Sequence, residues 1–95
     1  MNKVKPIYMI IGYEYLDEKV NWGYYYSFEE AEQAVLNNVT DLHKDYYNLM
    51  LIEEIYPGLV GRCENVYFYE WDSKNKKYVG IDRPESFAHI CNFFM

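Results

Sequence analysis

The stretch from Ser27 to about Tyr47 constrains the fold most, because its apolar residues recur at the spacing of an amphipathic helix. Apolar positions three and four residues apart form one stripe along a helix, which can pack on a sheet. The stripe consists of Phe28, Ala31, Val35, Val39, Leu42 and Tyr46, with Ala34 at its edge. Ser27 and Glu30 have the spacing of a capping box, in which the serine oxygen accepts an amide hydrogen of the first turn. The sequence therefore predicts one long helix over residues 27–47.

Two strand-like segments precede this helix. Pro6–Tyr15 is rich in β-branched and aromatic residues, which is typical of a strand. Alternation places Ile7, Met9, Ile11 and Tyr13 on one face, and Tyr8, Ile10, Gly12 and Glu14 on the other. The polar segment Asp17–Asn21 predicts a hairpin loop, and Trp22–Tyr26 returns as a second strand. The chain is therefore expected to open with an antiparallel hairpin.

Three further strands are expected after the helix, over Leu49–Ile55, Asn65–Asp72 and Lys77–Ile81. Pro57-Gly58 marks a turn, because proline fixes one dihedral angle and glycine permits positive φ. The polar Ser73–Lys76 segment is expected to form the loop between the last two strands. These segments predict a second hairpin in the carboxy-terminal half.

A short carboxy-terminal helix is predicted from Pro84, since proline suits the first helical position. Its apolar positions at helical spacing are Phe87, Ile90, Cys91 and Phe94. The expected order is β-β-α-β-β-β-α, in a single α+β domain over residues 1–95. The predicted architecture is a mainly antiparallel five-stranded sheet with the long helix on one face.

Aromatic residues are the first candidate for function. Twelve tyrosines exceed what one small core can use, because each buried hydroxyl needs a hydrogen-bond partner. Tyrosine and tryptophan also dominate binding hot spots. The predicted aromatic binding face consists of Trp22, Tyr24, Tyr67, Tyr69 and Trp71. The alternative is that these rings pack beneath the carboxy-terminal helix or form cross-strand pairs with no binding role.

Negative charge is the second candidate, because the net charge of −6 is concentrated in one segment. Residues 27–56 carry Glu29, Glu30, Glu32, Asp41, Asp45, Glu53 and Glu54 against Lys44 alone. A helix with this charge steers a basic protein surface toward itself. The predicted acidic binding surface on the helix consists of Glu29, Glu30, Glu32, Asp41 and Asp45. The alternative is a solvated helix face without a partner.

Direct nucleic-acid binding and membrane insertion are not expected. The acidic segment lacks the cations that displace counterions from phosphates, and Lys74, Lys76 and Lys77 form the only basic cluster. No apolar run has the length of a membrane span, and Pro6 and Glu14 leave no room for a signal peptide. Two cysteines do not make a disulfide scaffold, so a cytoplasmic location is expected.

Catalytic, cofactor and metal sites are not expected either. The candidate metal ligands His43, His89, Cys63 and Cys91 lack paired spacing. Glu53 and Glu54 fall on opposite faces of a strand, so they are poorly placed for shared acid–base chemistry. Gly58–Gly61 has the outline of a glycine-rich loop but no adjacent lysine, so it is interpreted as a turn.

Three motifs carry a resemblance to other proteins. They are Tyr-Met-Ile-Ile-Gly-Tyr-Glu-Tyr at 8–15, Tyr-Ser-Phe-Glu-Glu-Ala-Glu-Gln-Ala at 26–34 and Tyr-Glu-Trp-Asp at 69–72. With them the chain resembles small uncharacterised proteins of low-GC Gram-positive bacteria and their phages. The resemblance implies a small binder or inhibitor of a host protein, for instance of an antiviral defence system, and it assigns no functional residue.

Two functional hypotheses follow. The first is a non-catalytic module that binds a protein, such as one with a basic nucleic-acid-binding cleft, or a second copy of the chain. The second is a small-molecule-binding protein or small enzyme, with a pocket between the sheet and the carboxy-terminal helix. Tyrosine hydroxyls, His89 and Cys91 would line that pocket.

Overall fold

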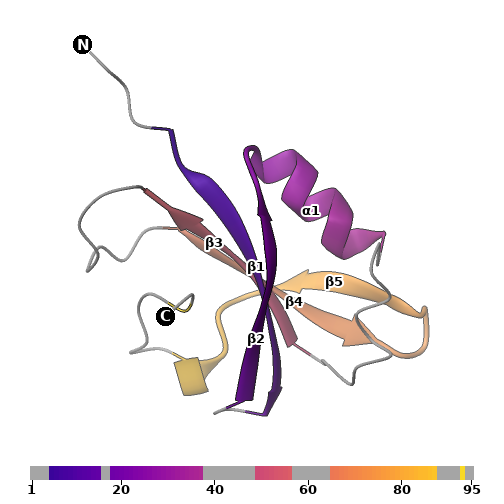
Figure 1. Cartoon of the computed structure of the whole chain (residues 1–95). Coiled ribbons are helices and arrows are strands. Elements are labelled where there is room, and N and C mark those ends of the chain that lie inside the picture. Colours follow the sequence, from indigo (N-terminus) through magenta and orange to yellow (C-terminus); the bar gives the residue numbers. More distant parts are fainter. Residues whose placement is uncertain (1–4, 16–17, 38–48, 57–64, 88–92, 94–95) are drawn as a thin grey trace.

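The computed structural model describes residues 5–15, 18–37, 49–56, 65–87 and 93. Five strands and one helix are present in these residues: β1 (Ile7–Tyr15), β2 (Glu18–Tyr25), α1 (Phe28–Leu36), β3 (Leu49–Ile55), β4 (Val66–Asp72) and β5 (Lys77–Ile81). The strands form one antiparallel sheet in the order β2-β1-β3-β4-β5, as Figure 1 shows. The predicted α+β class with an antiparallel five-stranded sheet is therefore confirmed.

The sheet separates two apolar clusters, and the alternation predicted for β1 sorts its side chains correctly between them. The helix-side core lies between the sheet and α1 and contains Ile10, Ala31, Ala34, Val35, Met50, Ile52, Tyr69 and Tyr78. The C-terminal core lies on the opposite face and contains Ile11, Tyr13, Leu51, Phe68, Phe87 and Phe93. Figure 1 shows α1 and the turn before the carboxyl terminus on opposite sides of the sheet.

The first hairpin corrects one prediction. Residues 18–21, expected in a loop, belong to β2, which begins at Glu18. β2 is an edge strand of the sheet, and charged residues on an edge strand block further pairing. Polar composition alone therefore does not distinguish a hairpin loop from an exposed edge strand.

A β-bulge interrupts the alternation of β2. Ile10 pairs with Gly23 and Ile11 pairs with Asn21, so Trp22 is the extra residue. Gly23 adopts φ of 137°, a conformation that side-chain-bearing residues rarely adopt. Because the bulge shifts the alternation, Trp22 and Tyr25 both pack against the helix-side core.

Helix α1 begins as the capping-box spacing predicts. The Ser27 Oγ atom accepts the Glu30 amide hydrogen at 3.2 Å and donates to the Glu30 carboxylate at 3.1 Å. Ala31, Ala34 and Val35 are buried against the sheet. The helix ends at Leu36, and the predicted continuation to Tyr47 lies outside the described residues.

The carboxy-terminal segment contains a 3₁₀ turn, η2 (Glu85–Phe87), where a helix was predicted to begin. The remaining positions of that predicted helix, 88–92 and 94, lie outside the described residues. Phe87 and Phe93 are nonetheless almost fully buried in the C-terminal core. The second face of the sheet is therefore covered in part by the end of the chain.

Candidate functional site

The structure does not bring the five predicted aromatic residues together on one exposed surface. Tyr69 is 4% exposed, and both Trp22 and Trp71 pack against the helix-side core. Tyr67, on the same face, is 37% exposed. Tyr24 is 51% exposed but pairs with Met9, which packs on the C-terminal core, so its ring belongs to the opposite face. Helix α1 and the β2 bulge account for this division, and sequence alternation alone reveals neither.

The predicted acidic surface is also divided. Glu29 and Glu30 lie exposed in the first turn of α1. Glu32 is half-buried, and its Oε2 atom accepts the Tyr69 hydroxyl hydrogen at 2.7 Å. Asp41 and Asp45 lie outside the described residues. Only the first two carboxylates therefore form an exposed acidic patch on α1, which we call the Glu29–Glu30 patch.

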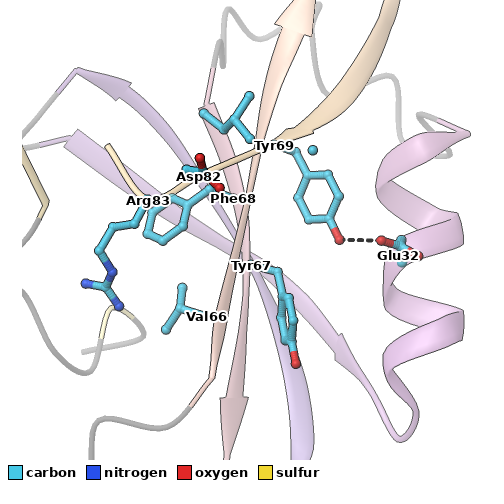
Figure 2. Close-up of a pocket in the computed structure, with 9 residues that line it drawn as sticks. Glu32, Val66, Tyr67, Phe68, Tyr69, Asp82 and Arg83 are labelled. Carbon is cyan, nitrogen blue, oxygen red and sulfur yellow. Dashed lines mark hydrogen bonds between the residues drawn. The ribbon is translucent and has the colours of Figure 1, made fainter. Parts of the chain in front are cut away.

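An open depression of about 730 Å³ lies beside β4, between α1 and the chain that leaves β5 (Figure 2). It is lined by Glu32, Val66, Tyr67, Phe68, Tyr69, Gly80, Ile81, Asp82 and Arg83. We call it the β4 depression. It includes Glu32, Tyr67 and Tyr69 of the predicted site residues, and no sequence pattern predicted it.

The depression exists because β5 is shorter than β4. The pairing of the two strands begins at Phe68 and Ile81, so Val66 and Tyr67 have no partner on β5. Gly80 pairs with Tyr69 and has no side chain to fill the space. A Cβ atom added to Gly80 would lie 3.9 Å from Cε2 of Tyr69, which places the tyrosine ring close to this glycine.

The charges around the depression differ between its two sides. Burial, the hydrogen bond to Glu32 and the charge of Glu32 together raise the pKa of the Tyr69 hydroxyl. Tyr69 therefore remains a donor at neutral pH. Arg83 donates to the Phe87 carbonyl oxygen at 2.9 Å, and Figure 2 shows its guanidinium pointing away from Tyr69. The side near α1 therefore carries the Glu32 carboxylate without a cation from the lining residues.

An aromatic row connects this depression to the start of α1. The Phe28 ring lies 4.4 Å from Tyr67 and 6.1 Å from Tyr8, measured between centroids. The Tyr8 hydroxyl donates to Oε2 of Glu54 at 3.3 Å, and burial followed by the Glu54 charge raises its pKa. Phe28 therefore connects an exposed tyrosine on β4 with a tyrosine–carboxylate pair on β1 and β3.

Sequence reasoning placed Glu53 and Glu54 on opposite faces of a strand but missed the role of Glu53. Its side chain is 3% exposed, and its Oε2 atom accepts the Phe93 amide hydrogen at 2.9 Å. Lys19 Nζ donates to the Phe93 carbonyl oxygen. Burial raises the pKa of Tyr13, with a contribution from the Glu53 charge, and burial lowers that of Lys19. The side chains of Glu53 and Lys19, which we call the Phe93 clamp, hold Phe93 on the sheet.

The predicted ligand pocket beneath the carboxy-terminal segment is occupied by protein where the structure describes it. The Tyr13 ring lies 5.0 Å from Phe87 and 6.3 Å from Phe93, and the two phenylalanine rings lie 5.9 Å apart. His89 and Cys91 lie outside the described residues. The described aromatic side chains of this region therefore serve as core.

The described residues contain no group of three or more His, Cys, Asp or Glu side chains that could hold a metal ion. His43 and Cys63 lie outside them. In the part of the chain that the structure describes, no helix has both the length and the apolar character needed to cross a bilayer.

The chain matches no protein-family model, no curated protein and no solved structure. The Glu29–Glu30 patch, the aromatic row and the β4 depression are therefore the features of the described residues that bear on function.

Proposed function

We propose that this chain is a non-catalytic module that binds a protein partner through the face that carries α1. The observation that supports this most directly is the proximity of exposed carboxylates and exposed aromatic area. Glu29 and Glu30 directly follow Phe28, whose ring contacts Tyr67. Rigid aromatic side chains supply contact area at low entropic cost, and neighbouring charges select the partner.

The Glu29–Glu30 patch defines the kind of partner. Two carboxylates in the first turn of a helix attract a positively charged surface and accelerate its encounter with the chain. A protein with a basic nucleic-acid-binding cleft has such a surface. In that case the chain acts as an inhibitor that occupies the cleft, in line with the proposed role of a phage or mobile-element protein directed at host defence.

Charge reversal on α1 tests the proposal. The chain is immobilised and exposed to a lysate of its source organism, and retained proteins are compared between wild type and Glu29→Lys/Glu30→Lys. The control is Glu70→Lys/Glu85→Lys, which makes the same charge change at exposed positions outside α1. The unfolding temperature of each variant is measured alongside, because Glu30 also belongs to the cap of α1.

We expect one partner to be retained by the wild type and the control but lost from the α1 variant. Retention should fall as salt rises from about 0.05 to about 0.5 M, because ions screen exposed charges. A partner retained equally by all three folded proteins at every salt concentration would contradict this assignment of the binding face.

A further inference from the structure

We propose that the β4 depression receives the guanidinium group of an arginine side chain from the protein partner, stacked on the exposed ring of Tyr67 and hydrogen-bonded to Glu32. This inference rests on the proposed function and specifies the chemistry of the partner. Three features of the depression support it: its exposed aromatic ring, the position of its carboxylate and the direction taken by its own arginine.

The exposed ring of the depression is Tyr67. It is 37% exposed, whereas Tyr69 on the same face of β4 is 4% exposed and belongs to the helix-side core. Phe28 supports Tyr67, with 4.4 Å between ring centroids. Because Tyr67 and Glu32 both line the depression, a planar cation there can meet an aromatic ring and a carboxylate together.

The carboxylate lies where a cation in this space would need it. Glu32 projects from α1 toward β4, and its Oε2 atom already accepts from Tyr69 (Figure 2). A carboxylate offers about four acceptor positions, so it can accept from a guanidinium while keeping this bond. Because Glu32 is half-buried, water screens its charge less than at the exposed positions Glu29 and Glu30.

The arginine of the depression does not compete for this carboxylate. The Arg83 guanidinium carbon lies 5.4 Å from the Phe68 ring centroid and 5.5 Å from that of Phe93, on the other face of the sheet. Its NH1 group donates to the Phe87 carbonyl oxygen at 2.9 Å. Figure 2 shows Asp82 beside Phe68, away from α1, so Glu32 is the charged lining residue near α1 and that space favours a cation.

Arginine fits this space better than lysine does. A guanidinium is flat, stacks on aromatic rings and presents several donors in one plane. A lysine ammonium is a compact, strongly hydrated charge that gains less from lying on an aromatic ring. A nucleic acid is disfavoured because its phosphates would approach Glu32 and Asp82.

Blocked tripeptides test the inference with the intact chain. Gly-Arg-Gly, Gly-Lys-Gly and Gly-citrulline-Gly are titrated while amide chemical shifts are followed by NMR. Citrulline keeps the shape of arginine but carries no charge. We expect saturable shifts at Tyr67, Tyr69 and Gly80 with the arginine peptide, and affinity about tenfold lower for the citrulline peptide. Free arginine, titrated separately, should shift the same amides.

Variants assign the site. Glu32→Gln should weaken arginine-peptide binding about tenfold, and Tyr67→Ala should weaken it several-fold. Glu70→Gln, at an exposed position of the strand that carries Tyr67, is the matched control and should leave binding unchanged. Equal binding of the arginine and citrulline peptides, shifts distributed over the surface, or an unaffected Glu32→Gln variant would overturn the inference.

The outcome is separable from that of the proposed function. One outcome is that the partner is lost from Glu29→Lys/Glu30→Lys but the arginine peptide causes no localised shifts. This outcome would contradict arginine binding in the β4 depression and would still support partner binding through the α1 face. Localised shifts without any partner dependent on α1 would support an arginine site and contradict the proposed binding face.

Discussion

The two faces of the sheet use the same kinds of residue in opposite ways. On the C-terminal face, Glu53 is 3% exposed and is committed to the backbone of Phe93. On the α1 face, Glu29 and Glu30 are exposed, and Glu32 is bonded to a tyrosine at the edge of an open depression. The comparison shows that carboxylate and tyrosine content alone does not identify a binding surface.

The difference arises from what covers each face. Helix α1 satisfies its own backbone hydrogen bonds, so its side chains are free to form a polar rim. In the described part of the carboxy-terminal segment, side chains bond the backbone three times: Arg83 donates to Phe87, Lys19 donates to Phe93, and Glu53 accepts from Phe93. The first face is therefore suited to binding and the second to stability.

Phe93→Ala should have the largest effect and tests the structural role of the second face. Phe93 is 1% exposed and packs near Tyr13, Phe68 and Phe87. Its truncation should lower the free energy of unfolding by about 3–4 kcal/mol, measured by urea denaturation. Phe28→Ala, at a half-buried position on the α1 face, should cost about 1–2 kcal/mol. Equal losses would remove the distinction between the faces.

Glu53→Ala should have the next largest effect, because it leaves the buried amide of Phe93 without its acceptor. A loss of about 2–3 kcal/mol in the free energy of unfolding is expected. Glu53→Gln keeps an acceptor oxygen and should recover part of this loss. Glu29→Ala, on the exposed helix turn, should change stability by less than about 1 kcal/mol. A Glu53→Ala variant as stable as Glu29→Ala would show that the clamp contributes nothing.

Tyr69→Phe removes the hydrogen bond between β4 and α1 and should cost about 1.5 kcal/mol at neutral pH. It should also change how the free energy of unfolding depends on pH above pH 10. The pKa of Tyr69 in the folded chain is raised above the ordinary 10.0, so the folded state keeps a proton that the unfolded state releases. The associated stability is complete below pH 10 and is lost as pH rises toward the folded-state value.

Urea midpoints measured from pH 8 to about pH 11 check this prediction. The wild type should lose stability above pH 10, and Tyr69→Phe should lose less over the same interval. Lys19 acts in the opposite direction, because its lowered pKa makes stability rise with pH up to the ordinary 10.5. Tyr24→Phe, at a position 51% exposed, is the control for removing a hydroxyl. If stability falls equally with pH above pH 10 in Tyr69→Phe and in the wild type, Tyr69 is not the source of the alkaline loss of stability.

The sequence predicted local features well and distant contacts poorly. Period-two alternation placed Ile10 and Ile11 on the correct sides of the sheet, and the serine cap set the start of α1. Both signals come from residues close in sequence. The Glu32–Tyr69 bond joins residues 37 positions apart, so no local pattern could indicate it.

One missed feature did have a sequence signal. Glu53 lies on the same face of β3 as Leu51, and the residue paired with it on β1 is Met9. A carboxylate at a core-facing position of a strand indicates a buried partner. That partner, the Phe93 backbone, lies 40 positions away, so the signal identified the site but not the contact.

Ser27→Ala should have the smallest effect, and it tests whether binding needs an ordered start of α1. The serine oxygen accepts the Glu30 amide hydrogen, so its loss should lower the free energy of unfolding by about 1 kcal/mol. Because the cap only fixes the first turn of α1, the Phe93 clamp should be unaffected, and hydrogen exchange at the Phe93 amide should change only in proportion to global stability. The Glu29–Glu30 patch lies in that turn, so partner retention should weaken more than the stability loss alone explains. Retention identical to wild type would show that binding does not need an ordered helix start.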